Sequence, residues 1–241
     1  MKVSVIGIHN LKQTVSVSGF LPNTQNTIQS FDVAFDYSLY DIAISLQEKG
    51  HDTSLIANFS SAPLSIMALN ELEEKGVSVY PDLQTEVTFD LVVNTQDKSY
   101  LFKDPTQLTI SSFQEKIIKE SEYIITNLDS FDGLMALNAY DNDKIILVNA
   151  LPMYRALTFV QGIVLDHVPE NKEETVTSLL QSGLSWMAIE NHGIIEFYTL
   201  KNKIVLNIGC VKVFLDQFLK AIEENTLLDW LALNKLAEDL D

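Results

Sequence analysis

Arginine is almost absent from this sequence: 15 of its 16 basic residues are lysines, and Arg155 is the one arginine. Arginine is the side chain that clamps phosphates with two parallel hydrogen bonds, so bidentate phosphate clamps are nearly excluded. The basic residues are outnumbered by 33 Asp and Glu, which gives a formal net charge of −17. Such a charge repels polyanions, which argues against nucleic acid and anionic membrane surfaces as partners.

Glycine and cysteine are also scarce. The nine glycines include no adjacent pair and no G-x-G spacing, so neither a dinucleotide-binding fingerprint nor a Walker loop can be written in this chain. The single cysteine, Cys210, excludes an intramolecular disulfide, and no Cys/His cluster has zinc spacing. Apolar runs are too short for a signal peptide or a membrane-spanning helix. We therefore expect a cytoplasmic protein without membrane contact.

Short β-branched runs alternate with segments of helical periodicity along the chain. The runs are typical of buried strands, and Gly50, Gly76 and Gly183 close several of the helical segments. This alternation predicts an α/β fold with three layers, in which helices cover both faces of a parallel sheet. The expected strands are 3–6, 53–57, 123–126, 144–148, 162–165 and 186–189, and the expected helices are 40–49, 64–75, 131–139, 173–181, 211–222 and 227–240.

Two regions break this rhythm. Residues 14–35 and 85–102 alternate polar and apolar side chains, as exposed antiparallel strands do. They predict a small extra sheet built from two insertions, at about 11–35 and 85–103. We expect one domain over residues 1–241 that carries this extra sheet.

The order of several motifs resembles the ribokinase (PfkB) family of sugar and nucleoside kinases. The motifs are a first strand that ends Val5-Ile6-Gly7, a β-insertion, a helix closed by Gly50, the pattern Leu69-x-x-Leu72-x-x-x-Gly76-Val77, and a late helix after Gly209. The likeness is one of layout across nearly the whole chain. It implies a central parallel sheet between helices and a small β-sheet lid that closes over the sugar.

The resemblance also implies a site at the start of the late helix. Family members have G-A-G-D there, with backbone N–H groups that form an anion hole and an Asp that acts as the general base. This sequence reads Gly209-Cys210-Val211-Lys212. The position of the base is therefore Lys212, which is not expected to work as one, and the anion hole falls on Gly209, Cys210 and Val211.

Other family positions are altered as well. The resemblance places the sugar-binding side at Asn10, Lys12, Asp36 and Asp41, and it puts Glu190 where glycine would face the nucleotide. A carboxylate there repels ATP.

The family's N-x-x-E motif survives as Asn171 to Glu174, and it implies a magnesium role for Glu174. The same four residues are also typical of a helix start, with Asn171 as N-cap and Glu174 completing a capping box.

Three hypotheses follow for the function. The first is a degenerate family member that has lost phosphate transfer and binds a small ligand, a sugar or a nucleoside, or has a regulatory role; it needs no cofactor. The second is an active kinase with ATP and magnesium, whose base has moved to Asp36, Asp41 or Asp216. The third is an interaction module that forms a homodimer through the lid strands.

Overall fold

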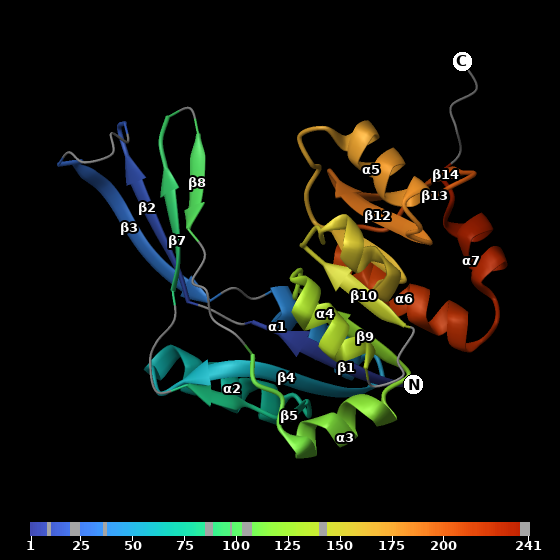
Figure 1. Cartoon of the computed structure of the whole chain (residues 1–241), viewed down its shortest axis with the longest axis horizontal. Helices are drawn as coiled ribbons and strands as arrows, with labels where there is room; N and C mark the ends of the chain where they lie inside the picture. The colour runs from blue at the N-terminus through green and yellow to red at the C-terminus, as the bar shows by residue number, and fades with distance from the viewer. Residues whose placement is uncertain are drawn as a thin grey trace.

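The structure is a computed structural model of the chain, and it describes residues 1–8, 11–19, 25–35, 38–84, 89–96, 98–102, 108–139 and 144–236. Two sheets make up its β structure, a large one at the centre and a small one that projects from it (Figure 1). Within the described ranges, no helix is both long and apolar enough to cross a membrane.

The large sheet has ten strands, and most of its strand pairs are parallel. Its order is β14-β13-β12-β11-β10-β9-β1-β4-β5, and β6 pairs with the far end of β4. The strands are β1 (Lys2–Gly7), β4 (Asp52–Ser60), β5 (Ser78–Val79), β6 (Asp82–Gln84), β9 (Tyr123–Thr126), β10 (Ile145–Val148), β11 (Gly162–Leu165), β12 (Trp186–Asn191), β13 (Ile194–Thr199) and β14 (Lys203–Leu206).

Helices cover both faces of this sheet, as the alternation predicted. Successive residues of a strand point to opposite faces, so each strand supplies both cores. In β12, Trp186 and Ala188 join one core, whereas Met187 and Ile189 join the other. The first core is covered by α1 (Ser38–Glu48), α2 (Pro63–Glu74), α6 (Val211–Glu223) and α7 (Leu227–Asn234), and the second by α3 (Ser112–Glu120), α4 (Phe131–Asn138), α5 (Lys172–Gln181) and a 3-10 turn (Tyr154–Phe159).

The sheet differs from the prediction at one edge. β13 and β14 extend it as antiparallel strands, since β12, β13 and β14 are joined by short turns rather than by crossover helices. Antiparallel neighbours need only a tight turn, while parallel ones need a longer crossover. The predicted parallel sheet is therefore present, and this edge adds two antiparallel strands that the alternation did not indicate. Helix α7 ends at Asn234 rather than at residue 240, and residues 237–241 lie outside the described part of the chain.

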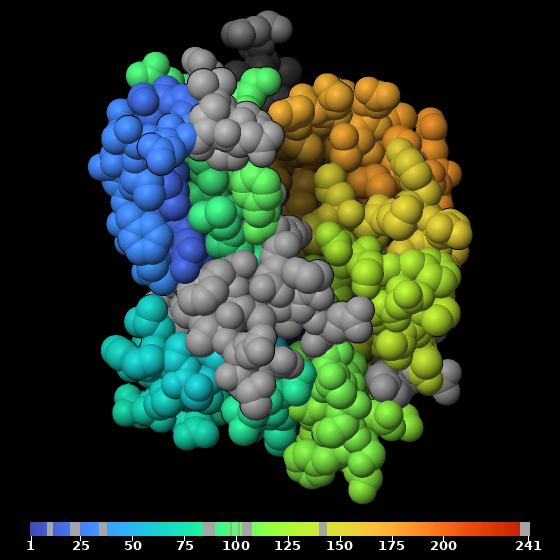
Figure 2. Space-filling view, turned by 60° about the vertical axis from the view of Figure 1, so that its left-hand side comes forward, coloured from blue at the N-terminus to red at the C-terminus, as the bar shows by residue number. Residues whose placement is uncertain are grey.

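The small sheet is the predicted lid. Its strands are β2 (Leu11–Val17), β3 (Ile28–Phe35), β7 (Phe89–Asn94) and β8 (Ser99–Phe102), which lie within the two expected insertions. They are arranged in the order β3-β2-β7-β8 and stand beyond the end of the large sheet (Figure 1). In Figure 2 the lid lies on one side of the visible face, and the yellow and orange elements of the second half of the chain lie on the other.

One pairing in the lid was not expected. β2 and β3 form one antiparallel hairpin and β7 and β8 form another, but β2 and β7 pair in parallel. The first strand of each hairpin leads away from the large sheet, so the two first strands run in the same direction where they meet. The prediction of an antiparallel lid is correct inside each hairpin and wrong at their junction.

The two faces of the lid differ in polarity. Residues paired across strands share a face, and one such row contains Phe31, Val15, Val93 and Tyr100. The neighbouring row, on the other face, contains Ser30, Ser16, Asn94 and Ser99. Phe31 is 58% exposed and Tyr100 is 38% exposed. The lid therefore carries apolar side chains that this chain alone leaves in contact with water.

A buried carboxylate holds the antiparallel edge to helix α5. Glu196 on β13 accepts hydrogen bonds from Lys172 Nζ at 2.8 Å and from the Tyr198 hydroxyl, and Lys203 Nζ lies 3.3 Å from its other oxygen. Burial alone would raise the pKa of Glu196. The hydrogen bonds from Lys172 and Tyr198, together with the charge of Lys203, instead lower that pKa from 4.5 to about 2.

This carboxylate predicts an acid-sensitive contribution to stability. A carboxyl group whose pKa is lower in the folded than in the unfolded chain stabilises the fold above pH 4.5 and loses that contribution as the pH falls toward 2. We expect Glu196→Gln to destabilise the protein by roughly 1–3 kcal/mol at pH 7, because Lys172 loses an ionised partner. Urea unfolding at pH 7, 4 and 3 measures the difference from the wild type, which should shrink as the pH falls. Glu174→Gln, at an exposed position, is the control, and a difference that does not depend on pH contradicts the prediction.

Candidate functional site

A cavity of about 140 Å³ opens at the carboxyl edge of the large sheet. The first turns of α1 and α6 form part of its wall, and residues at the ends of β10, β11 and β12 form the rest. Ligands of open α/β sheets bind at this edge, where loops from several strands converge. The cavity is lined by Ser38, Asp41, Ile42, Asn149, Asp166, Glu190, Cys210, Val211 and Lys212.

Glu190 is directed to this cavity by the turn that follows it. β12 and β13 are joined by the two residues His192 and Gly193, both of which have positive φ (51° and 81°). A two-residue turn of this kind fixes the register of a hairpin. Glu190 thereby falls on the same face as Trp186 and Ala188, which pack in the core beneath α1 and α6.

The Glu190 carboxylate caps the start of α6. Its Oε2 accepts a hydrogen bond of 3.1 Å from the backbone N–H of Val211, the first residue of that helix. The N-cap residue Cys210 makes no side-chain cap hydrogen bond. Glu190 thus supplies, from another element, an acceptor for one of the N–H groups that have no partner within the helix.

This contact bears on whether the residues fit the phosphates of ATP, the group that the resemblance to ribokinases implies. The N–H of Val211, which the resemblance places in the anion hole, already donates to a carboxylate. A phosphate placed there would meet a like charge, so these residues do not fit it. Among the described residues, those of the cavity included, no group of three His, Cys, Asp or Glu side chains could hold a metal ion.

Asp41 and Lys212 face the cavity from the two helices. Partial removal from water raises the pKa of Asp41, whereas the positive charge of Lys212 lowers it, and Glu71 adds a smaller contribution that raises it. The net result is a pKa above the ordinary value of 3.8. The cavity therefore has a carboxylate that holds protons more readily than usual, next to a cation.

Asp166 is a lining residue that the sequence did not single out. Its Oδ2 accepts a hydrogen bond of 2.8 Å from Asn149 Nδ2, and its Oδ1 lies 2.9 Å from His167 Nδ1. The backbone N–H of Asp166 in turn donates to Asn149 Oδ1 at 2.9 Å. Asn149 has a φ of 52°, an unusual conformation for a residue other than glycine. These contacts hold the Asp166 carboxylate in one orientation at the cavity wall.

Five of the predicted site residues line the cavity together: Asp41, Glu190, Cys210, Val211 and Lys212. Lys12 lies elsewhere, on β2 of the lid, and Gly209 immediately precedes the lining segment without belonging to it. Asn10 and Asp36 fall outside the described residues. The sequence could have drawn attention to Asn149 and Asp166, because both directly follow a buried strand and so had to lie at the carboxyl edge.

The N-x-x-E segment lies apart from the cavity. Asn171 and Glu174 are both exposed and do not line it. Asn171 is the N-cap residue of α5, but its side chain makes no cap hydrogen bond. The helix start was predicted correctly and its capping box was not, since Asn171 has φ −112° and ψ 57° rather than the extended conformation that an N-cap side chain needs.

Asp216, one of the predicted alternative bases, does not line the cavity. It is buried in the middle of α6, where its Oδ1 lies 3.2 Å from His51 Nε2 and 3.0 Å from Lys220 Nζ. One turn of helix separates it from Lys212, and this turn carries it toward the opposite edge of the sheet, where β4 begins next to His51. It is therefore a partner of two basic side chains, at a place away from the cavity.

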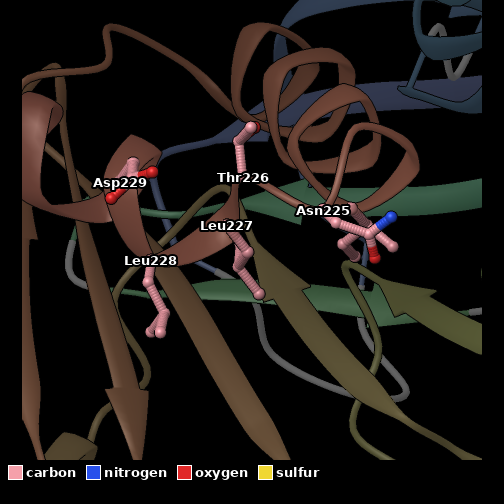
Figure 3. Close-up of a pocket in the computed structure, with 6 residues that line it drawn as sticks. Asn225, Thr226, Leu227, Leu228 and Asp229 are labelled. Carbon is pink, nitrogen blue, oxygen red and sulfur yellow. The ribbon is translucent and has the colours of Figure 1, made fainter.

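A second cavity, of about 390 Å³, lies at the turn between α6 and α7 (Figure 3). In this view Leu227 and Leu228 point to the same side of the turn, away from Thr226. Among the described residues that line it, Asp229 is the one titratable side chain. The smaller cavity, with its three carboxylates and one lysine, is therefore the better candidate for a functional site.

Comparisons with known proteins identify the fold. No protein-family model matches the sequence, and no curated protein matches it either. Solved structures match along nearly the whole chain. A ribokinase from Thermotoga maritima is 12% identical with a TM-score of 0.67, over 95% of this chain and 89% of that one.

Two further structures agree with it. A carbohydrate kinase from Agrobacterium tumefaciens is 15% identical with a TM-score of 0.62, over 96% of this chain and 89% of that one. A ribokinase from Arabidopsis thaliana, solved with ribose and ATP, is 11% identical with a TM-score of 0.64, over 95% of this chain and 88% of that one. The chain has a ribokinase-like fold, as the resemblance implied. Identities this low establish the fold alone.

The opposed charges of Asp41 and Lys212 predict a measurable coupling. Because Lys212 lowers the pKa of Asp41, we expect Lys212→Met to raise that pKa further. NMR titration of the Asp41 carboxyl carbon measures it directly. Lys201→Met, which removes an exposed lysine at the β13–β14 turn, is the control. An Asp41 titration that is the same in Lys212→Met and in the wild type contradicts the prediction.

Proposed function

We propose that this protein binds a small uncharged ligand of the sugar or nucleoside class, or acts through such binding as a regulator, and does not transfer phosphate. The observation that carries the proposal is the presence of Lys212, opposite Asp41, in the cavity at the start of α6. Support for the ligand class comes from the Arabidopsis ribokinase of the same fold, which was solved with ribose. The proposal places the protein in the cytoplasm, in keeping with its single cysteine.

The chemistry of lysine explains why phosphate transfer is not proposed. Transfer to a hydroxyl requires a base that accepts the hydroxyl proton, and a lysine ammonium has three donors and no acceptor. Loss of a general base alone costs about 10²- to 10⁴-fold in rate. Lys212 can instead donate hydrogen bonds to ligand oxygens, while Asp41 and Asp166 accept them from ligand hydroxyls.

We expect no measurable phosphate transfer from ATP to ribose, glucose, fructose or adenosine. Coupled detection of ADP release tests this, with an active ribokinase as positive control. Lys212→Asp alone should not restore transfer, because Glu190 would still meet the phosphates. A thermal-shift screen of the same compounds tests binding separately, since a ligand stabilises the folded state whether or not it reacts. Turnover by the wild type contradicts the proposal, and so does the absence of any shift.

The second candidate function is an active kinase with ATP and magnesium, and one observation favours it. Asp41 lines the cavity and has a raised pKa, which suits a general base. Asp41→Asn and Lys212→Ala distinguish the two candidates. Turnover that persists in Lys212→Ala and is lost in Asp41→Asn would identify Asp41 as a relocated base.

We also propose a homodimer through the lid, which the apolar row of Phe31, Val15, Val93 and Tyr100 supports. Phe31 and Tyr100 would leave water if two lids packed face to face. We expect Phe31→Asp to weaken the dimer by tenfold or more, because it places a charge in the apolar contact. Ser30→Asp, on the other face of β3, is the control. Sedimentation velocity measures both, and a wild type that is monomeric at high concentration contradicts the dimer.

A further inference from the structure

The first residue of α6 has an internal partner that carries a full negative charge. Helix N-termini favour anions, because their first N–H groups lack partners within the helix and the helix dipole is positive there. At α6 the N–H of Val211 donates to Glu190 Oε2 at 3.1 Å. The carboxylate belongs to a different element, β12, and lines the cavity together with Val211. Its position is thus the one that an anionic ligand would take.

The other charges of the cavity strengthen this effect. Asp41 and Asp166 line the same cavity, and Lys212 is the one basic residue among its described lining residues. Asp166 is kept in place by Asn149 and His167, so it is not free to turn away from an incoming anion. Three carboxylates against one lysine leave the wall with an excess of negative charge.

We propose that Glu190 is the residue that restricts this cavity to ligands without a phosphate group, by acting as an internal anion at the start of α6. The inference rests on the proposed function, since it concerns the ligand class of the same cavity. It assigns the selection to one side chain rather than to the overall charge of −17. An uncharged polyol can enter without displacing Glu190, whereas a phosphate must compete with it for the Val211 N–H.

A purely structural cap would leave the same hydrogen bond in the structure, so the test has to separate charge from capping. Glu190→Gln keeps a side-chain oxygen that can accept from Val211 and removes only the charge. Glu224→Gln is the matched control, because it removes the same charge from the opposite end of α6. Glu190→Gly removes both the acceptor and the charge.

Calorimetry with inorganic pyrophosphate, and in parallel with Mg-ADP, measures the gain of anion binding in the full chain. We expect no binding by the wild type or by Glu224→Gln in the low-micromolar to millimolar range. Glu190→Gln and Glu190→Gly should bind pyrophosphate with a Kd at least about tenfold below the highest concentration at which the wild type shows no binding, as expected for removing one like charge at close range. Binding of Mg-ADP but not of pyrophosphate would show that the nucleoside, rather than the phosphate, is recognised, and would overturn the proposal.

The remaining outcomes also decide the matter. Pyrophosphate binding by the wild type at up to millimolar concentration overturns the proposal, as does the absence of any gain in both Glu190 variants. Failure of both variants to fold would identify Glu190 as a structural cap and would overturn it as well. The thermal-shift screen with ribose and adenosine separates this inference from the proposed function. If a neutral ligand raises the melting temperature of the wild type and the Glu190 variants gain no anion binding, the inference is wrong and the proposed function still stands.

Discussion

The large sheet is buried on both faces, and this constraint determines where the polar side chains of the molecule can go. Within a strand such as β12, residues before Glu190 alternate between two apolar cores, so no charge can be placed there without a partner. Polar groups are left to the strand ends. Because neighbouring parallel strands end at the same edge, Asn149, Asp166 and Glu190 come together although they are far apart in sequence.

Two buried carboxylates away from that edge, those of Glu196 and Asp216, show what the same constraint requires when a charge is buried. Glu196 and Asp216 are each held by two basic side chains, Glu196 by Lys172 and Lys203 and Asp216 by His51 and Lys220. A charge this deep is tolerated only when paired. At the cavity, by contrast, the carboxylates of Asp41 and Asp166 retain access to an open volume, and a ligand can use them.

The sequence was sufficient for the architecture where a pattern repeats along the chain. The apolar strand runs, the glycine-closed helices and the polar–apolar alternation of the lid each predicted an element that the structure contains. The pairing of strands from different hairpins was harder to predict from the sequence. β2 pairs with β7 in parallel because of the way the two hairpins approach each other, and no local sequence pattern encodes that approach. β13 was missed because the charged Glu196 interrupts its apolar run. That charge is tolerable because Lys172, Tyr198 and Lys203 all contact the carboxylate, and Lys172 is distant in sequence.

The sequence predicted the part of the candidate site whose residues are consecutive in the chain. Lys212, Cys210 and Val211 are consecutive, and the layout of the motifs pointed to them. Asn149 and Asp166 each follow a buried strand, which places them at the carboxyl edge, but only the order of the strands shows that they meet Glu190 there. Asp216 was misleading because helical position alone does not say which end of the sheet a side chain faces. The hydrogen bond between Glu190 and Val211 joins residues 21 positions apart and depends on the register that the His192-Gly193 turn imposes.

That contact follows from a general requirement of helix ends. The first N–H groups of α6 face a cavity and have no acceptor within the helix, so water, a ligand or another side chain must satisfy them. With Cys210 as N-cap no local side chain does so, and Glu190 provides the acceptor from β12. A carboxylate fits this place for the same electrostatic reason that a phosphate would, because both are anions at the positive end of a helix. The arrangement that stabilises the start of α6 is therefore also the one that an anionic ligand would have to displace.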